Sequence, residues 1–491
     1  MLPFIAGLAI ALPSVHKDLV ADVRNALYVG GTAWKSTLFT GKATYYGEPS
    51  TFSFQFEPGG KFLQSVKGPL GESYGSDGTT YWQTDRTGAP RILHFEDQDL
   101  QQAFLIVQTN GWINPPEGVM VSSEGNTIHV TLPTGLQEDL DIDPATHLPT
   151  VATFDASPGK IKIELSDWRP AGEWKMPYRT QVTTGGLTDT FQAESAKEAA
   201  SPDYSVPQWT TNNISFDPTA SNVLEAKKLS TGHIIVHPLI NGKDVGWFIL
   251  DSGADIVVID PAIADALKLP KVGMLPLVGV GGVIQEPFRT VSQLKLGPAT
   301  LSNTQCAELD LSVFRRVFGI NVAGIIGFDL FRRSIISVDF DKTAVSLYDP
   351  TKFTLPSGAE WIETQFSTGN IALQAKMEGD RTGWYRLDTG AMGTVQFHSP
   401  YVKKEHLLEG RETVITQEAG AGGTSEARAG RIAWFELAGH RFENPEAVFS
   451  QATIGAFNDR YLAGNIGQDF MKPFTVYFDF GGSRVALVPK N

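Results

Sequence analysis

The chain has one cysteine, Cys306, among its 491 residues, so it can form no intrachain disulfide. It has no excess of basic residues either, because 40 Lys and Arg against 54 Asp and Glu give a formal net charge of −14. That balance argues against nucleic acid and against an anionic membrane surface as partners. Cys306 has apolar neighbours and no histidine nearby in the sequence, so we expect a small buried strand residue and no nucleophile.

Residue pairs with the spacing of metal ligands are scarce. Among the nine histidines, we find only His233 and His237 at the four-residue spacing that could place two ligands on one helix face. The three apolar residues between them predict a strand, in which residues four apart lie roughly 13 Å from one another. The sequence therefore implies no metal site, and it points to no other cofactor.

The apolar run near the N-terminus, residues 2–12, is too short to span a membrane. Its length and the Pro-Ser that follows fit the core of an export signal over residues 1–16, although the usual preceding basic residues are missing. Either the chain starts with an atypical or truncated signal, or the run packs against the first helix. We favour export, which would place the mature protein in the periplasm or outside the cell; otherwise it is cytoplasmic.

What the chain does contain is a tripeptide that occurs twice. Residues 251–253 read Asp-Ser-Gly and residues 388–390 read Asp-Thr-Gly, each after an apolar run and each before an alanine. A single copy would be a common way for a strand to enter a turn. A second copy that is followed by the same later landmarks needs another explanation.

The landmarks after each tripeptide keep nearly the same spacing. A Gly-x-Gly-Gly segment begins 28 residues after the first Asp (279 − 251) and 32 after the second (420 − 388). A second segment has its glycine at offsets of 76 (327 − 251) and 79 (467 − 388), and a pair of β-prone runs closes each copy. This order indicates an internal repeat of a whole domain. We call residues 225–352 repeat 1 and residues 353–491 repeat 2.

The landmarks resemble those of aspartic proteases of the retroviral type, over roughly residues 225–491. The resemblance implies a mainly β fold with two retropepsin-like lobes in tandem, which form a pseudo-dimer in one chain. The protein would then be a monomer with an internal pseudo-two-fold axis. It also implies that Asp251 and Asp388, one from each repeat, are the catalytic pair that acts on a peptide or protein substrate.

The pairing has an electrostatic reason. Two carboxylates held about 3 Å apart cannot both ionise cheaply, so such a pair shares a proton. One member can act as general base on a water while the other donates a proton to the scissile carbonyl. The apparent pKa values belong to the pair, so the sequence assigns neither role. Ala254 and Ala391 carry no hydroxyl to stabilise the anions, and we therefore expect a mildly acidic pH optimum.

The resemblance gives roles to the other landmark residues. Ser252 and Thr389 would hydrogen-bond across the lobe boundary, and Gly253 and Gly390 permit a close backbone approach. Taken alone, glycine clusters are ordinary surface turns. Placed as they are in both repeats, they are expected at the tips of mobile hairpins, or flaps, over the substrate. The flap residues are Gly279, Gly281, Gly282, Gly420, Gly422 and Gly423. We expect the second flap, residues 416–430, to be the longer one.

The region before the repeats contains neither the tripeptide nor an acid pair. Residues 17–28 have helical spacing, and the runs that follow alternate with period two, as in residues 51–56 and 160–165. This order loosely resembles the curved sheet of periplasmic lipoprotein-carrier proteins. Such a sheet could hold an acyl chain or a peptide on its concave face, and it could equally be a folding aid or a cover on the protease cleft. We expect an antiparallel β domain with a helix over residues 17–193 and a linker over residues 194–224.

Two functions from different classes stay open. The first is an aspartic endopeptidase, a hydrolase that uses an intrachain Asp pair. The second is a non-catalytic peptide or lipopeptide-binding protein on the same scaffold. A pair of facing carboxylates favours catalysis, because a cleft that only binds has no need for two groups whose mutual repulsion costs stability.

Overall fold

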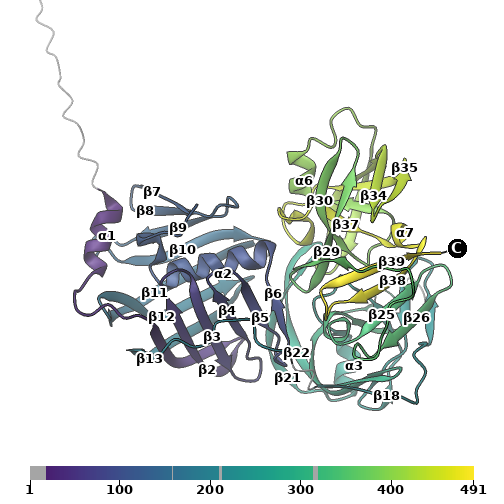
Figure 1. The fold of residues 1–491 in the computed structure, drawn as a ribbon, viewed down its shortest axis with the longest axis horizontal. Helices are drawn as coiled ribbons and strands as arrows, with labels where there is room; N and C mark the ends of the chain where they lie inside the picture. The colour runs from purple at the N-terminus through teal and green to yellow at the C-terminus, as the bar shows by residue number, and fades with distance from the viewer. Residues whose placement is uncertain (1–17, 158, 210–212, 313, 315–318, 491) are drawn as a thin grey trace, which may run out of the picture.

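The computed structural model describes residues 18–157, 159–209, 213–312, 314 and 319–490 (Figure 1). The export signal predicted for residues 1–16 lies outside these residues. The fold is mainly β, as predicted, and four sheets hold the strands of the described residues. The chain forms an N-terminal body, purple to blue in Figure 1, and a C-terminal body, teal to yellow.

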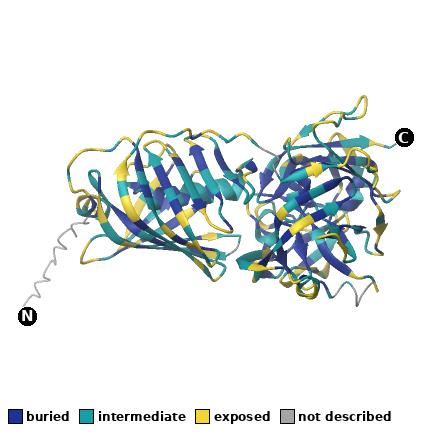
Figure 2. Cartoon of the chain, turned by 90° about the horizontal axis from the view of Figure 1, so that it is seen from below, coloured by how far each residue is buried: buried dark blue, intermediate teal, exposed yellow. Residues whose placement is uncertain are grey.

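One antiparallel sheet of 13 strands builds the N-terminal body, in the order β6-β5-β4-β3-β2-β1-β13-β12-β11-β10-β9-β8-β7. Its residues alternate as the period-two pattern predicts: Phe52 and Phe54 are buried and Thr51 is exposed. The buried apolar residues of this body form two clusters, and Figure 2 shows buried segments on many of its strands. The strands are β1 (Thr37–Tyr45), β2 (Glu48–Glu57), β3 (Lys61–Lys67), β4 (Ser73–Asp77), β5 (Tyr81–Thr84), β6 (Pro90–Ile92), β7 (Met120–Glu124), β8 (Thr127–Thr131), β9 (Gln137–Ile142), β10 (Pro149–Ala156), β11 (Gly159–Ala171), β12 (Trp174–Thr184) and β13 (Leu187–Glu198).

Two α-helices pack on this sheet. The helix predicted for residues 17–28 is α1 (Leu19–Leu27), whose N-cap Asp18 accepts a hydrogen bond from the Ala21 amide at 3.3 Å. The second, α2 (Phe95–Gln108), was not predicted; a 3₁₀ turn, η1 (Gly111–Ile113), follows it. Its buried residues Ala103, Ile106 and Val107 join a core formed with strands β8 to β11. Burial against the sheet therefore stabilises α2.

Repeat 1 contributes most of an 11-stranded sheet and repeat 2 a 10-stranded one. The first contains β14 (Ile214–Phe216), β15 (Ala226–Lys228), β16 (Ile234–Val236), β17 (Leu239–Ile240), β18 (Lys243–Asp244), β19 (Trp247–Leu250), β20 (Val258–Ile259), β21 (Lys271–Gly279), β22 (Gly282–Leu296), β23 (Ala299–Glu308) and β24 (Val322–Ile326). The second contains β28 (Gln365–Ser367), β29 (Asn370–Met377), β30 (Arg381–Leu387), β31 (Val395–Phe397), β32 (Val414–Gly420), β33 (Gly423–Arg431), β34 (Trp434–Leu437), β35 (His440–Glu443), β36 (Glu446–Ser450) and β37 (Gly464–Ile466). Cys306 is a buried residue of β23, as expected.

The two sheets share one pairing pattern around the tripeptides. The strand before the first tripeptide, β19, runs parallel to β24, which pairs antiparallel with β20. The strand before the second, β30, runs parallel to β37, which pairs antiparallel with β31. β20 and β31 then run parallel to β23 and β36. Short helices follow at matching places: α3 (Pro261–Ala266) and α5 (Phe328–Phe331) in repeat 1, and α6 (Ser399–Lys404), the 3₁₀ turn η2 (Ala456–Asn458) and α7 (Gln468–Met471) in repeat 2.

A third sheet of the C-terminal body joins the repeats. It has five strands: β26 (Ala344–Tyr348), β25 (Ile335–Asp339), β38 (Phe474–Asp479), β39 (Arg484–Pro489) and β27 (Ile362–Glu363). β25 of repeat 1 pairs antiparallel with β38 of repeat 2, and the pair is visible where teal and yellow strands meet in Figure 1. One hydrophobic core runs through both repeats, so the two fold as one unit.

The expected linker at residues 194–224 needs a correction. Residues 194–198 are the end of β13, because they continue the ladder with β1, for example at Leu38↔Lys197. Strand β14 pairs with β23 of repeat 1. Between them, the carbonyl of buried Tyr204 accepts a hydrogen bond from Trp82 Nε1 at 2.9 Å. The described parts of this stretch are therefore packed against the two bodies they join.

The N-terminal body holds the β21–β22 hairpin of repeat 1. The Met274 amide donates to the Tyr46 carbonyl at 2.9 Å, and the Gly273 amide donates to Glu48 Oε1 at 2.8 Å. On the other strand, Gln285 Nε2 donates to the Gly185 carbonyl at 3.0 Å. Two turns of the N-terminal sheet, β1–β2 and β12–β13, thus form hydrogen bonds to the two strands of this hairpin.

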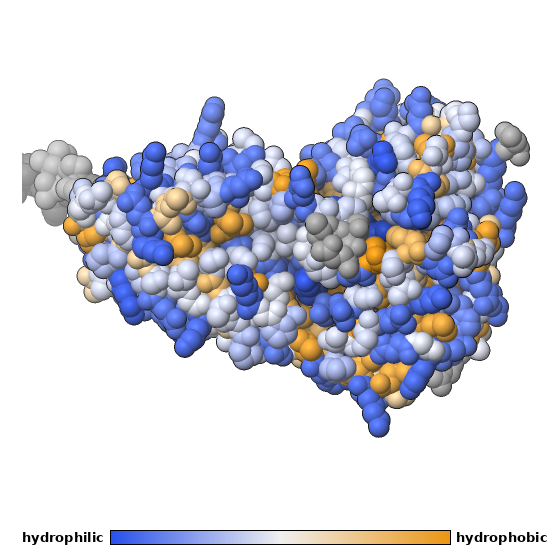
Figure 3. Space-filling model, turned by 60° about the horizontal axis from the view of Figure 1, so that its bottom comes forward, coloured by the Kyte–Doolittle hydropathy of each residue, from blue (hydrophilic) through white to orange (hydrophobic). Residues whose placement is uncertain are grey.

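The surface is mostly polar on the face shown in Figure 3, where apolar side chains form small separate patches. None of the helices in the described parts of the chain is both long and apolar enough to cross a bilayer.

Replacing Glu48 by alanine should loosen the β21–β22 hairpin. Loss of a hydrogen bond to a charged acceptor costs about 1.5 kcal/mol, so amides of residues 271–289 should exchange with deuterium about tenfold faster. Glu194→Ala is the matched control, because Glu194 pairs only with exposed Lys42 at 3.2 Å. Equal exchange in both variants would show that the contact does not restrain the hairpin.

Candidate active site

Asp251 and Asp388 occupy equivalent places at the ends of β19 and β30. The Asp251 amide donates to the Ile326 carbonyl at 3.0 Å, and the Asp388 amide donates to the Ile466 carbonyl at 3.0 Å. Each acceptor directly precedes the glycine of the second landmark segment of its own repeat, Gly327 or Gly467, so that segment fixes the start of the loop. Gly327 lies so close beneath its loop that a Cβ would come 2.6 Å from the Ala254 carbonyl oxygen.

The two loops are locked together by four reciprocal hydrogen bonds. Ser252 Oγ donates to the Leu387 carbonyl at 2.7 Å and accepts from the Thr389 amide at 3.0 Å. Thr389 Oγ1 donates to the Leu250 carbonyl at 2.8 Å and accepts from the Ser252 amide at 2.8 Å. Both hydroxyls are buried, so breaking either bond would leave polar groups unsatisfied.

These bonds bring the two carboxyl groups face to face. A Cβ built on Gly253 would lie 2.5 Å from Asp388 Oδ1, and one built on Gly390 would lie 2.5 Å from the Asp251 carboxyl carbon. Both glycines are therefore required by the approach of the opposite carboxylate. Each glycine amide also donates to the Asp two residues earlier, at 2.7 Å to Asp251 Oδ1 and 2.9 Å to Asp388 Oδ1.

The environment raises the pKa of both carboxyls. Burial comes first for each, and the facing Asp388 carboxylate raises the pKa of Asp251 further. The nearby guanidinium of Arg386 opposes the rise at Asp388. Each carboxyl keeps one partly exposed side, while protein surrounds it elsewhere. Two carboxyls in this setting do not ionise independently of one another.

A second set of contacts between the repeats was not predicted from the sequence. Residues 230–233 read Ser-Thr-Gly-His and residues 367–370 read Ser-Thr-Gly-Asn, each ending 18 residues before the Asp of its own repeat (251 − 233 and 388 − 370). His233 Nε2 donates to the Gly390 carbonyl at 2.9 Å, and Asn370 Nδ2 donates to Asp255 Oδ1 at 2.6 Å. Each motif thus braces the loop of the opposite repeat. The tripeptide Ser-Thr-Gly, which occurs in both repeats, was the available signal.

The glycine clusters form the tips of two hairpins, β21–β22 and β32–β33. Gly279 pairs with Gly282 and Gly420 pairs with Gly423, so each loop has two residues. The tips touch: the Gly281 amide donates to the Ala421 carbonyl at 3.1 Å. The glycines are needed because a Cβ at Gly279 or Gly281 would lie 2.1 Å from a carbonyl oxygen of the other tip.

The second hairpin is the shorter one, so the expected order of length is wrong. Pairing begins at Lys271↔Arg289 in the first hairpin and at Val414↔Ala429 in the second. The glycine and alanine content of the second suggested a longer loop, but these residues pair in its strands. Most residues of β32 are exposed, whereas most of β21 are half-buried. The two flaps therefore differ in support more than in length.

The two histidines at metal-like spacing serve separate purposes. His233 contacts the loop of repeat 2, and its Nδ1 is 2.7 Å from Thr231 Oγ1. His237 stacks on Trp247 and pairs with Asp244 at 2.8 Å. Within the described residues, no group of three or more His, Cys, Asp or Glu side chains could hold a metal ion.

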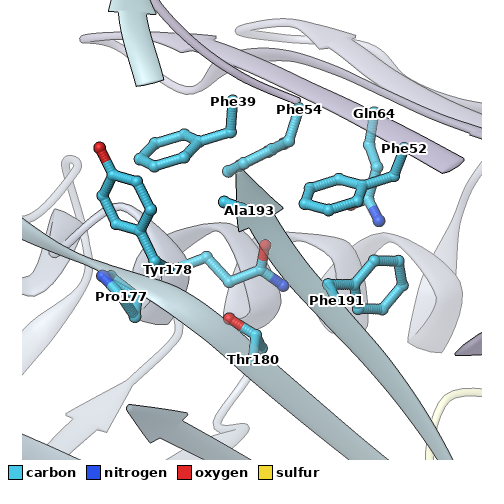
Figure 4. Close-up of a pocket in the computed structure, with 10 residues that line it drawn as sticks. Phe39, Phe52, Phe54, Gln64, Pro177, Tyr178, Thr180, Phe191 and Ala193 are labelled. Carbon is cyan, nitrogen blue, oxygen red and sulfur yellow. The ribbon is translucent and has the colours of Figure 1, made fainter. Parts of the chain in front are cut away.

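A separate hollow lies in the N-terminal sheet (Figure 4). Aromatic side chains from four neighbouring strands turn toward it, and polar groups lie at its margin. The lining residues are Phe39, Phe52, Phe54, Gln64, Gln108, Pro177, Tyr178, Thr180, Phe191 and Ala193. Such a lining suits an apolar group with one polar end.

Thr389→Val should weaken the joined loops. Valine keeps the shape but removes one donor and one acceptor of the reciprocal set, which costs about 2 kcal/mol of unfolding free energy. Thr389→Ser is the matched control, since it keeps the hydroxyl that Ser252 supplies in repeat 1. Urea unfolding of both variants tests this, and equal loss in the two would contradict it.

Asp251→Asn should stabilise the protein at neutral pH. A folded-state pKa above the unfolded one contributes stability that is complete below the unfolded pKa and is lost as pH rises through the folded pKa. Asparagine avoids that loss, which is about 1.4 kcal/mol per pKa unit. Melting curves from pH 4 to 8 should show a gain over the parent that shrinks toward pH 4. The surface variant Asp469→Asn should show no such trend.

Comparison with known protein families gives a match in repeat 1. Residues 236–330 match a family model described as aspartyl protease. The matched segment holds the first tripeptide, the β21–β22 flap and the apolar segment that ends at Gly327. No curated protein matches the chain. The match supports an aspartic protease family for this part of the chain, and with it a protease in general.

Proposed function

We propose that this protein is an aspartic endopeptidase whose active site is formed by Asp251 and Asp388 in a single chain. The observation that carries the proposal is the reciprocal bonding of Ser252 and Thr389, which holds the two carboxyls face to face. The matching strand pairing of the repeats favours a pseudo-dimer of two retropepsin-like lobes. The aspartyl protease match supports the same reading for repeat 1.

The chemistry follows from a pair that holds one proton. The ionised carboxyl takes a proton from a water, whose oxygen bonds to the peptide carbonyl carbon. The protonated carboxyl gives its proton to the carbonyl oxygen, so a neutral tetrahedral intermediate forms. The C–N bond then breaks as the nitrogen takes a proton from the first carboxyl, and one hydroxyl of the intermediate returns a proton to the second. The raised pKa values of both groups favour a mildly acidic optimum.

The flaps supply the cover that this reaction needs. Their tips meet through the Gly281 and Ala421 bond, and a substrate must part them to enter. An extended peptide under the two hairpins would be shielded from bulk water, which strengthens the electrostatic interactions at the pair.

A second candidate is a peptide or lipopeptide binder without catalysis. The hollow in the N-terminal sheet favours it, because aromatic residues such as Phe39, Phe52 and Phe191 suit an acyl chain or an apolar side chain (Figure 4). In that case the Asp pair would not be needed for binding.

Cleavage of a mixed peptide library between about pH 4 and 7 tests the proposal. We expect cleavage by the parent and a loss of about 1,000-fold in kcat/KM for both Asp251→Asn and Asp388→Asn, because each removes one proton-transfer group. Asp469→Asn should retain activity, since Asp469 bridges only to Lys472 at the surface.

The alternatives give different results in the same assay. A folded parent that cleaves nothing, and that binds peptides equally well as Asp388→Asn, would favour the binder. Cleavage that survives both substitutions would place the catalytic groups elsewhere.

A further inference from the structure

The two halves of the Asp pair have different polar surroundings. Asn465 Nδ2 donates to Asp388 Oδ2 at 2.9 Å. The equivalent residue of repeat 1, two places before Gly327, is Ile325, whose side chain has no hydrogen-bond donor. Asp388 therefore accepts a side-chain hydrogen bond from the segment that ends at Gly467, whereas Ile325 in the segment that ends at Gly327 cannot donate one to Asp251.

A buried histidine determines which end of Asn465 meets Asp388. His398 Nε2 lies 3.0 Å from Asn465 Oδ1, and both side chains are almost fully buried. Burial lowers the pKa of His398 to about 4, so the ring is neutral above that pH. A neutral ring with its proton on Nε2 donates to Oδ1, which turns the amide N–H toward Asp388. Asp388 Oδ2 must then accept, and an ionised carboxylate accepts this hydrogen bond more strongly than a protonated carboxyl does.

The difference extends over several positions of repeat 2. Arg386, beside Asp388 in β30, stands where repeat 1 has Ile249, and it is paired with buried Asp459 at 3.6 Å. His398 is the N-cap of α6, whereas the matching helix α3 has Asp260 as its N-cap. Among the residues that the structure describes, this cation and this amide donor of repeat 2 thus stand where repeat 1 has Ile249 and Ile325.

We propose that Asn465, oriented by His398, is a positioning residue that keeps Asp388 as the ionised member of the pair, so that the shared proton rests on Asp251. The assignment builds on the proposed endopeptidase function. Asp388 is then the base that takes the proton of the attacking water, and Asp251 gives its proton to the carbonyl oxygen. The new bond joins the water oxygen to the carbonyl carbon, and no other reactant is required.

Other charged groups that face the pair do not reverse this order. The carboxylate of Asp255 raises the pKa of Asp251, and the Arg386 guanidinium opposes the rise at Asp388. His233 contacts the Gly390 carbonyl next to Asp388. Asp459 pairs with Arg386 and so reduces the effect of that guanidinium on Asp388, but Arg386 still lowers the pKa of Asp388. Each of the first two effects acts in the same direction as the Asn465 bond.

The test compares the pH profile of kcat/KM for the parent and Asn465→Ile, which copies repeat 1. Loss of the bond to the anion should move the acidic limb upward by about one pH unit, with little change in KM. The double variant Asn465→Ile with Ile325→Asn gives the donor to the other repeat, and its acidic limb should return toward the parent. An unmoved limb in Asn465→Ile would overturn the proposal.

Variants at His398 separate orientation from packing. His398→Leu leaves Asn465 Oδ1 without its donor, so the amide can turn and the acidic limb should rise. His398→Gln keeps an N–H at that place and should restore the parental limb. If both variants behave alike, His398 does not orient Asn465 and this part of the proposal fails.

A readout without catalysis keeps the two proposals distinguishable. The bond is stronger when Asp388 is ionised, so its extra contribution to stability is present above the folded pKa of that group and is lost as pH falls through it. The difference in melting temperature between the parent and Asn465→Ile should therefore be larger at pH 7 than at pH 4. A difference that is constant with pH would overturn the inference. A parent that cleaves no peptide would reject the protease while this result still decided the ionisation.

Discussion

The arrangement depends on two buried hydroxyls that exchange hydrogen bonds across the boundary between the repeats. Ser252 and Thr389 each donate to a carbonyl and accept from an amide of the opposite loop. The bonds hold two carboxyls together although their mutual repulsion and burial oppose it. The sheet in which β25 pairs with β38, and the core that runs through both repeats, hold the repeats together and so support these bonds.

The N-terminal body supports one flap and leaves the other without such contacts among the described residues. Its turns hold the β21–β22 hairpin through Tyr46, Glu48 and Gly185, whereas strand β32 of the other flap is largely exposed. The flap of repeat 2 therefore has the greater freedom to open. The N-terminal body, which contains no Asp tripeptide, thus influences access to the Asp pair by holding one of the two flaps.

The chain's local motifs predicted the site better than its domain contacts. The Asp tripeptides, the glycine turns and their apolar segments are short and repeated, so both loops could be located from sequence. The helix α2 was missed because it lies among period-two runs and gains its stability from burial against the sheet. The grip on the first flap could not be predicted, since it uses backbone groups such as the Tyr46 carbonyl, which any residue type provides. Asn465 was visible only as a departure between repeats, and its partner His398 is 67 residues away.

Because both repeats lie in one chain, a substitution can change one half of the site without changing the other. In a dimer of identical subunits, a single substitution changes both sides at once, so an amide facing one carboxyl would face the other too. Here Asn465 donates a hydrogen bond to Asp388, whereas the equivalent residue of repeat 1 is Ile325. The two carboxyls of this pair therefore have different polar neighbours, which the carboxyls of a symmetric dimer cannot have.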